Sequence, residues 1–200
     1  TQYILDNNLK DINISNLVFK NNFYISCDVF FDLNNNFKIK MPKVEQFSEF
    51  SANIPSDVSP NIPDMLIPLI FDSHFVDISV PHVIFNFNKN NIELPSPNNI
   101  AEYYRNVGIS HNINLIKENE NENNISIRTF ERGVENETNA CGTGCCASAY
   151  YLYQKSNKKI KNFNFLTKLG YTINVDIDDQ ENIYLSGHAK KIFKGELSLI

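Results

Sequence analysis

One segment, from about Thr143 to Lys155, limits the fold more than any other part of this 200-residue chain. It is predicted to be a helix with apolar or amphipathic residues on nearly every face, and a helix of that kind is normally buried on all sides. At 1.5 Å per residue it would be about 20 Å long. That length suits a helix enclosed by a curved sheet. The residues concerned are Cys145, Cys146, Ala147, Ala149, Tyr150, Tyr151, Leu152 and Tyr153.

The rest of the chain is dominated by short segments with the alternation typical of β-strands. They are rich in Ile, Val, Phe and Tyr and are separated by Asn, Asp, Gly and Pro, which predicts a largely antiparallel sheet. A second helix is expected over Asn99–Asn106. The predicted strands are Leu17–Phe19, Asn22–Phe31, Asn36–Met41, Met65–Phe75, His82–Phe87, Ile113–Ile116, Ile125–Phe130, Tyr171–Ile177 and Ile183–Leu185.

Three segments read as connections between these elements. Ser51–Pro63 and Glu93–Ile100 contain prolines, which cannot donate to a strand ladder and bias the preceding residue away from helix. The wholly polar segment Lys117–Asn124 lies between two predicted strands and is expected to be an exposed hairpin turn.

Composition excludes several classes of function. The net charge of −5 is mild and no Lys/Arg cluster stands out, so nucleic acid is not an expected partner. No apolar run approaches the roughly 20 residues that span a bilayer, so we expect no membrane span. Three of the four cysteines lie at positions 141, 145 and 146, unlike the spread framework of a secreted disulfide fold, which favours reduced thiols in the cytoplasm. The chain begins at Thr1 without Met, which suggests that an upstream region has been removed.

Cys141 stands just ahead of a Gly-Thr-Gly turn that opens the long helix. Free backbone N–H groups and the positive end of the helix dipole gather there, so we expect a lowered pKa and a stabilised thiolate. The same N–H groups can hold a carboxylate, because Gly142 and Gly144 leave room for its approach. An isolated cysteine would be interpreted as a small core residue; the residues around Cys141 favour function.

The run from Glu131 to Gly144, ERGVENETNACGTG, resembles the second active-site motif of the diaminopimelate epimerase family. The similarity extends along the chain, through Met41-Pro42, Ser79-Val80-Pro81-His82, His111-Asn112-Ile113-Asn114, Leu185-Ser186-Gly187-His188-Ala189 and Phe193-Lys194-Gly195-Glu196-Leu197. TQYILDNNL at the start resembles the helix that follows the family's first cysteine motif, CGNG. That motif is absent from this sequence, and Cys27 is interpreted as a structural strand residue.

The resemblance implies an α+β fold of the diaminopimelate-epimerase type. This is a mostly antiparallel curved sheet or barrel around a central buried helix, with two pseudo-symmetric domains in the full protein. Residues 1–45 would complete the N-terminal domain, residues 46–190 would form the C-terminal domain with its central helix at about 143–155, and residues 191–200 would form a closing strand that returns to the N-terminal domain.

The resemblance also implies a reaction, the epimerisation of LL-diaminopimelate to meso-diaminopimelate in lysine and peptidoglycan precursor synthesis. It needs no cofactor or metal. Two thiols on opposite faces of the substrate exchange the α-proton, and this chain carries only the second, Cys141, so the 200 residues alone are expected to be inactive. The family further implies a small amino-acid substrate, a homodimer, and a cytoplasmic location, or a plastid one in a eukaryote.

Site residues follow from matching positions in the family. His82 and Glu131 match residues that assist the proton exchange of the thiols. Arg132 is expected to clamp the distal carboxylate in a bidentate fork, and Asn112 to contact the substrate. The amide N–H groups of Gly142 and Thr143 are expected to hold the carboxylate at the reacting carbon.

The chain departs from the family pattern at three places. The family commonly has Gly-Asn-Pro-His where this chain has Ser79-Val80-Pro81-His82, so Val80 lacks an amide side chain. The linker Val134-Glu135-Asn136 is one residue longer than the common Ala-Gly form. His188 stands where the family often has Pro and is interpreted as a surface or turn residue.

Three other functions are compatible with parts of the sequence. Proline racemase and related isomerases also place a cysteine ahead of a Gly-Thr-Gly turn, but they lack the ERG run. A zinc module built from Cys141, Cys145, Cys146 and His82 is disfavoured, since adjacent cysteines point to different sides of a helix. A non-catalytic protein of this fold that binds a carboxylate ligand stays open, because the partner thiol is missing.

Overall fold

The computed structural model describes residues 17–18, 24–25, 29–31, 37–50, 73–87, 93–106, 108–119 and 124–188, and it divides the chain into two compact units. Met41–Leu185 forms the larger unit, and Thr1–Lys40 with Ser186–Ile200 the smaller. Within the smaller unit, β1 pairs antiparallel with β2, and β3 with β4. These strands are β1 (Leu17–Val18), β2 (Tyr24–Ile25), β3 (Val29–Phe31) and β4 (Phe37–Lys40).

A mixed, curled sheet forms the larger unit, with strand order β13-β12-β11-β9-β8-β7-β6-β5 and β10 added beside β9. Most of the neighbours are antiparallel, but β7 and β8 run parallel, as do β9 and β11. The strands are β5 (Gln46–Glu49), β6 (Ser73–Asp77), β7 (Pro81–Asn86), β8 (Asn112–Glu118), β9 (Ile125–Glu131), β10 (Asn136–Thr138), β11 (Asn162–Leu166), β12 (Thr172–Ile177) and β13 (Ile183–Gly187).

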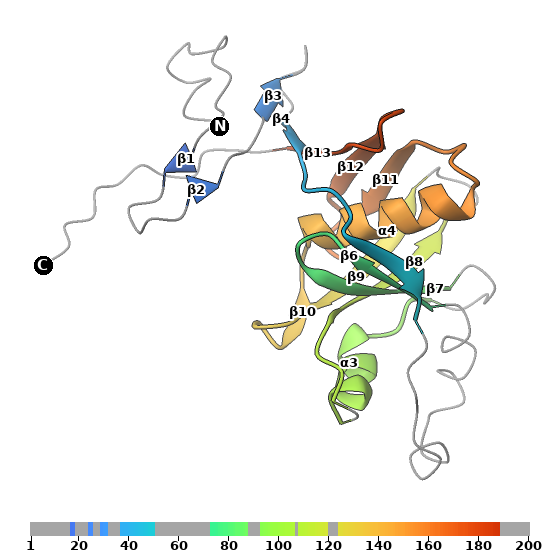
Figure 1. Ribbon diagram of the computed structural model, residues 1–200. Helices are drawn as coiled ribbons and strands as arrows, with labels where there is room; N and C mark the ends of the chain where they lie inside the picture. Colours follow the sequence, from blue (N-terminus) through green and yellow to red (C-terminus); the bar gives the residue numbers. More distant parts are fainter. Residues whose placement is uncertain are drawn as a thin grey trace, which may run out of the picture. The chain divides into compact units, whose positions relative to one another are not determined.

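The long helix, α4 (Gly142–Lys155), lies in the concave side of this sheet, as the sequence predicts (Figure 1). Cys145, Cys146, Ala147 and Ala149 are fully buried. They share one apolar core with side chains from seven strands, among them Val76, Ile84, Ile116, Ile127, Phe165, Val175 and Ile183. Burial on nearly every face explains why the helix carries so few polar residues.

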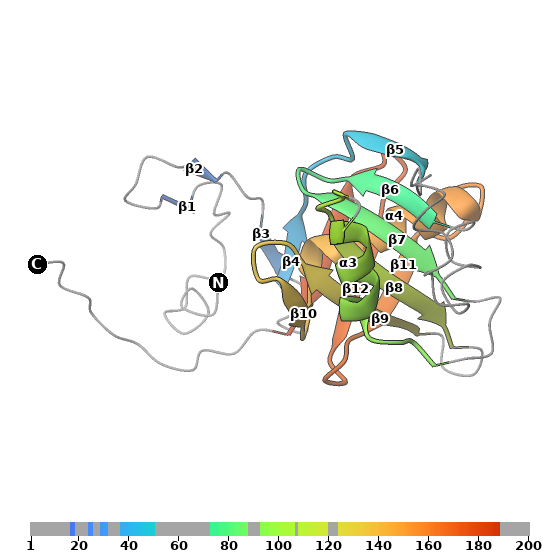
Figure 2. The ribbon, with the colours of Figure 1, turned by 90° about the horizontal axis from the view of Figure 1, so that it is seen from below.

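A shorter helix, α3 (Pro97–Asn106), covers the opposite face of the sheet (Figure 2). Ile100, Ala101 and Tyr104 pack there against a second core of strand residues that includes Phe85 and Leu115. Because successive side chains of a strand point to opposite faces, consecutive residues of β7 and β8 pack alternately into the two cores. In the described part of the chain, the result is a curled half-barrel with one helix on each face, which agrees with the predicted curved sheet around a buried helix.

Most of the predicted elements are present in the structure, with shifted ends, but the structure also contains three strands that the sequence did not predict. The predicted helix Asn99–Asn106 begins two residues earlier, at Pro97. At the predicted hairpin turn, β8 pairs antiparallel with β9 and the Asn119 N–H donates to the Asn124 carbonyl at 2.9 Å; Lys117 and Glu118 belong to β8, and residues 120–123 lie outside the described residues. The sequence analysis did not predict β5, β10 or β11. The connector Ser51–Pro63, Cys27 and residues 65–72 of one predicted strand lie outside the described residues.

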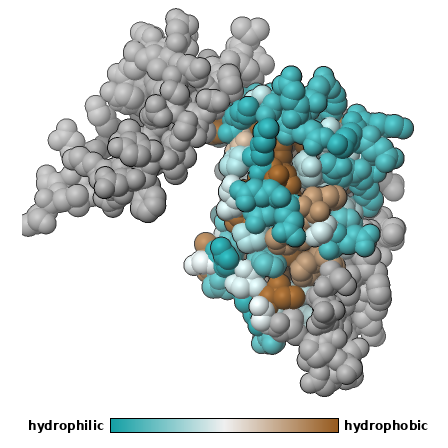
Figure 3. All heavy atoms as spheres, in the orientation of Figure 1, coloured by the Kyte–Doolittle hydropathy of each residue, from teal (hydrophilic) through white to brown (hydrophobic). Residues whose placement is uncertain are grey.

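On the face of the molecule in Figure 3, most of the described surface is hydrophilic and apolar residues show in one strip. Large apolar side chains that are exposed among the described residues include Val134, Ile160, Leu169 and Tyr171. No helix within the described ranges is long and apolar enough to cross a membrane.

Candidate active site

Polar side chains gather on the concave face of the sheet, beside the first turn of α4. His82 on β7 lies two residues before Ile84, and Asn114 on β8 lies two residues before Ile116. Residues two apart in a strand share a face, so His82 and Asn114 point to the same side as these core residues. Register places Asn114 opposite Thr129 of β9. A row of buried polar groups therefore replaces the apolar core at the end of the sheet where α4 begins.

Cys141 is the N-cap of α4. Its backbone is extended, with φ −128° and ψ 109°, and its Sγ accepts a hydrogen bond from the Gly144 N–H at 3.3 Å. The Thr143 hydroxyl lies 3.4 Å from Sγ. The thiol therefore takes the place of the Ser, Thr or Asp oxygen that commonly caps a helix, and only 7% of the residue is exposed.

The expected lowering of the thiol pKa is wrong for this structure. Burial raises the pKa of Cys141 above its usual value, and the hydrogen bonds from Thr143 and Gly144 only partly offset this. The Glu131 carboxylate raises it further, through its negative charge and by accepting a hydrogen bond from the thiol. A helix N-terminus favours the thiolate, but here desolvation and a neighbouring carboxylate outweigh it. Cys141 is therefore a thiol at neutral pH in this state.

His82 is fully buried and reaches Cys141 through Thr143. Its Nε2 lies 3.1 Å from the Thr143 hydroxyl oxygen, and its Nδ1 lies 2.9 Å from the Asn114 side-chain nitrogen. Burial, followed by the charge of His111, lowers the pKa of His82 to about 3. The imidazole is thus neutral throughout the physiological pH range.

Glu131 ends β9, and the Thr138 hydroxyl of the neighbouring β10 donates a short hydrogen bond to its Oε1. The turn between the two strands also orders the backbone, since the Glu135 N–H donates to the Glu131 carbonyl at 2.8 Å. Glu131 is thereby held beside the Cys141 thiol.

Asn112 and Arg132 lie at the same end of the sheet. The Asn112 side-chain oxygen accepts a 2.7 Å hydrogen bond from the Arg132 backbone N–H, which leaves the Asn112 amide nitrogen for another partner. Arg132 itself is exposed, and no described residue forms an ion pair with its guanidinium. Gly142 begins α4 in close contact with Leu185, whose Cδ2 would lie 2.9 Å from a Cβ at that position.

Two departures from the family pattern occupy left-handed backbone positions, where glycine is favoured. Ser79 has φ 63° and Glu135 has φ 55°. A non-glycine residue there costs roughly 1–2 kcal/mol, and Glu135 offsets part of this by accepting hydrogen bonds from the Gly133 N–H at 2.8 Å and from Arg105 at 3.2 Å. The longer linker is therefore accommodated in a closed turn. His188 is exposed, as expected.

Sequence reasoning missed Asn114 and Thr138, which hydrogen-bond directly to the predicted site residues His82 and Glu131, and Thr129, which hydrogen-bonds to Asn114. One signal was available for Asn114. It lies two residues before the core residue Ile116, so both side chains point to the same buried face of β8. A polar side chain on that face needs a hydrogen-bond partner.

An ion cluster on the outer side anchors β10. Arg128 donates to both oxygens of Glu137 at 2.7 Å and to the Leu94 carbonyl at 2.8 Å, and Lys168 adds a 3.0 Å contact to Glu137. Burial raises the pKa of Glu137, but the hydrogen bonds from Arg128 and Lys168 more than compensate and leave the pKa below its usual value. Because β10 carries Thr138, this cluster supports the position of Glu131.

Glu137→Gln is expected to lower the free energy of unfolding by about 1–3 kcal/mol at pH 7, because Arg128 loses its charged partner. The folded-state pKa of Glu137 is depressed, so its contribution is complete above the unfolded value of about 4.3 and disappears as pH falls through the folded value. Urea unfolding should therefore show the wild type and the variant converging below about pH 4. Glu102→Gln, on an exposed residue of α3, is the control. A difference that stays constant down to pH 3 would contradict this assignment.

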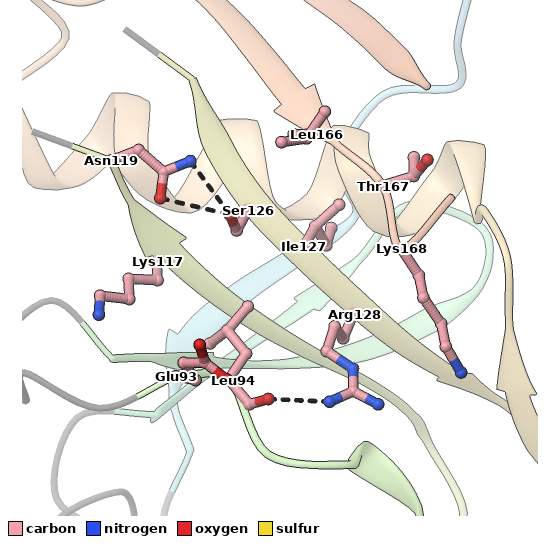
Figure 4. Close-up of a pocket in the computed structure, with 10 residues that line it drawn as sticks. All are labelled: Glu93, Leu94, Lys117, Asn119, Ser126, Ile127, Arg128, Leu166, Thr167 and Lys168. Atoms are coloured by element: carbon pink, nitrogen blue, oxygen red, sulfur yellow. Dashed lines mark hydrogen bonds between the residues drawn. The ribbon is translucent and has the colours of Figure 1, made fainter. Parts of the chain in front are cut away.

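A cavity of about 450 Å³ lies on the α3 side of the sheet, lined by Lys117, Arg128 and Lys168 among others (Figure 4). No predicted site residue lines it, and its Arg128 is already held by Leu94 and Glu137. Among the described residues, no group of three or more His, Cys, Asp or Glu side chains could hold a metal ion. Cys145 and Cys146, which a zinc site would use, lie in the core.

The chain is similar in sequence to known diaminopimelate epimerases. Diaminopimelate epimerase of Aquifex aeolicus is 36% identical over 129 residues, which cover 62% of this chain and 45% of that protein. The Chlorobaculum tepidum enzyme is 33% identical over 138 residues, covering 64% and 51% respectively. The chain thus spans about half the length of the curated relatives it matches.

Solved structures show the same fold at low sequence identity. A PhzF-family phenazine biosynthesis protein of Bacillus anthracis is 14% identical with a TM-score of 0.59, covering 92% of this chain and 69% of that one. A putative phenazine biosynthesis protein of Clostridium difficile is 16% identical with a TM-score of 0.61, covering 99% and 70%. A family model described as "Diaminopimelate epimerase" matches residues 75–192. Because that match covers more than half of the chain and includes every predicted site residue, the chain belongs to the diaminopimelate epimerase family.

Proposed function

We propose that the complete protein converts LL-diaminopimelate to meso-diaminopimelate without a cofactor, with Cys141 as one of two catalytic thiols. One observation carries this proposal. The Cys141 thiol lies at the first turn of a buried helix, between hydrogen-bond donors from Thr143 and Gly144 and the Glu131 carboxylate. A thiol held between donors and a base can both give up and take back a proton.

The proposed chemistry moves one proton across the substrate. One thiolate removes the α-proton and becomes a thiol, and the electron pair left on the α-carbon is delocalised into the adjacent carboxylate. The second thiol then donates its proton to the opposite face and becomes a thiolate. The raised pKa of Cys141 favours the thiol, so Cys141 starts in the donor role. In the reverse direction the roles exchange: the Cys141 thiolate is the base and the opposite thiol is the proton donor. Glu131 passes the Cys141 proton to or from solvent water when the protonation states of the two thiols reset.

The substrate would be held by groups that the site leaves available. N–H groups of the first turn of α4, those of Gly142 and Thr143, suit the carboxylate of the reacting centre, where negative charge develops. The guanidinium of Arg132, which pairs with no described residue, suits the distal carboxylate, and the amide nitrogen of Asn112 supplies a further donor. Family membership also supports a homodimeric, cytoplasmic protein in which the upstream half provides the first thiol and a second, pseudo-symmetric domain.

Proton exchange in deuterated water tests this proposal. The complete protein, including the region upstream of Thr1, is incubated with LL-diaminopimelate, and mass spectrometry follows deuterium at the α-carbon while chiral chromatography follows the meso product. Both signals are expected. The 200 residues alone are expected to give neither, because one thiol cannot serve both faces of the α-carbon.

Two outcomes would contradict the proposal. Robust turnover by the 200 residues alone would mean that a second thiol is not needed. If the complete protein binds the substrate, as measured by calorimetry, but exchanges no α-proton, it is a carboxylate-binding protein with the epimerase fold.

A further inference from the structure

The two ring nitrogens of His82 have different partners, and the partners differ in what they can do. Nδ1 faces the side-chain nitrogen of Asn114 at 2.9 Å, and Nε2 faces the hydroxyl of Thr143 at 3.1 Å. A hydroxyl can donate or accept, whereas an amide nitrogen only donates. The orientation of the Asn114 amide therefore decides which ring nitrogen carries the proton.

Two neighbours contact the Asn114 oxygen in that orientation. The Asn114 carbonyl oxygen accepts a hydrogen bond from the buried Thr129 hydroxyl at 3.0 Å. The same oxygen lies against Gly144, so close that a Cβ there would be 2.3 Å from it. A carbonyl oxygen against a glycine Cα can accept a weak C–H hydrogen bond, whereas a rotated amide would point an N–H at the same C–H group. The Gly144 contact favours the arrangement with the amide nitrogen toward His82, and the Thr129 hydroxyl satisfies the Asn114 oxygen in that arrangement.

We infer that Asn114, oriented by Thr129, is a positioning residue that holds His82 in the tautomer with its proton on Nε2. Nε2–H then donates to the Thr143 oxygen, which turns the Thr143 hydroxyl hydrogen toward Cys141 Sγ. A chain of three hydrogen bonds, from Asn114 through His82 and Thr143, thus ends on the sulfur and stabilises its thiolate. For its meaning in catalysis, this inference rests on the proposed function.

This role differs from the one predicted from the sequence. A neutral imidazole with its proton on Nε2 offers no lone pair toward Thr143 or Cys141, so His82 cannot take the thiol proton in this state. That task falls to Glu131, which already accepts a hydrogen bond from the thiol. His82 instead supplies a fixed donor, whose direction depends on a residue that touches neither the thiol nor the substrate.

Nitrogen NMR of the complete protein labelled with ¹⁵N-histidine reads the tautomer directly, without substrate. The chain has four histidines, and the signals lost in His82→Gln identify His82. At pH 7 the wild type is expected to show an unprotonated Nδ1 and a protonated Nε2. In Asn114→Asp the new carboxylate accepts from the ring, so Nδ1 is expected to become protonated, as in a Ser-His-Asp triad.

Further variants separate positioning from general damage. Thr129→Val removes the hydroxyl that holds the Asn114 oxygen and is expected to mix the two tautomers, whereas Thr129→Ser keeps the hydroxyl and the single tautomer. Asn174→Asp, the same change on β12, where the Asn174 amide nitrogen donates to Asn164, is the matched control and should leave His82 unchanged. A protonated Nδ1 in the wild type would overturn the inference. So would an unprotonated Nδ1 that persists in both Asn114→Asp and Thr129→Val.

Exchange of the substrate α-proton provides the functional readout. Asn114→Asp is expected to lower kcat at least about tenfold with little change in KM, since a wrong histidine tautomer costs about 10⁴-fold in a Ser-His-Asp triad. If the wild type exchanges no proton, the proposed function fails, while the NMR result still decides the tautomer. A normal kcat in Asn114→Asp with the altered tautomer would overturn the catalytic part of the inference alone.

Discussion

Cys141→Ser is expected to lower deuterium incorporation at the substrate α-carbon by about 10³-fold or more, while the protein stays folded. A hydroxyl has a far higher pKa than a thiol, so serine cannot exchange the α-proton, and loss of a general acid or base typically costs 10²–10⁴-fold. Serine is nevertheless a preferred N-cap and can keep accepting the hydrogen bond from the Gly144 N–H. This variant therefore removes the chemistry and preserves the start of α4.

Cys141→Ala separates the chemical role from the capping role. It should lose exchange as completely as the serine variant and, in addition, lose about 0.5–2 kcal/mol of stability, because the cap is gone. Thermal unfolding measured by circular dichroism checks this difference. Cys146→Ala, on a buried cysteine of the same helix that belongs to the apolar core, is the control and should retain exchange. Exchange at the wild-type rate in either Cys141 variant would mean that Cys141 has been misassigned.

Gly144→Ala is expected to damage the fold and the site together. A Cβ at this position would lie 2.3 Å from the Asn114 oxygen and 3.3 Å from the Cys141 Cβ. The Asn114 amide is held by His82 and Thr129 and cannot move aside without breaking those hydrogen bonds. Overpacking of this kind costs about 1–3 kcal/mol, more than the roughly 1 kcal/mol that alanine gains over glycine in a helix.

The expected result is a melting temperature several degrees lower and loss of proton exchange, because the His82 contact and the N–H donor to Cys141 both shift. Gly187→Ala is the matched control, since no atom of the described residues lies within 4 Å of a Cβ at that position. A Gly144→Ala protein with wild-type stability and exchange would show that Asn114 is free to move. The chain of hydrogen bonds proposed for His82 would then lose its anchor.

Local sequence pattern predicted the long elements well and the short ones poorly. The apolar surface of α4 and the alternation in β7, β8, β9 and β12 are strong signals, because each reflects burial on a defined face. In contrast, β10 consists of Asn136, Glu137 and Thr138, residues with no strand preference as a group. It forms a strand because Glu137 is held by Arg128 and Lys168, contacts that span 9 and 31 residues. No local pattern contains that information.

The site shows the same division. The motif around Cys141 identified the thiol, its carboxylate neighbour and the family, and the helix start lies where the sequence predicts it. The pKa of Cys141 was predicted in the wrong direction, because dipole and N–H donors are local to the chain whereas burial is not. Likewise, Asn114 is 32 residues from His82 in sequence and becomes its partner only through the parallel pairing of β7 and β8.

The sequence by itself determined that a helix without a polar face must be enclosed, that a strand-rich curled sheet encloses it, and that a cysteine stands at its start. These follow from the period and polarity of neighbouring residues, which act over a few turns or strand residues. Tertiary structure alone decided the protonation of the site, namely a thiol rather than a thiolate at Cys141 and a fixed tautomer at His82. Those states depend on desolvation and on which distant side chains meet across strands.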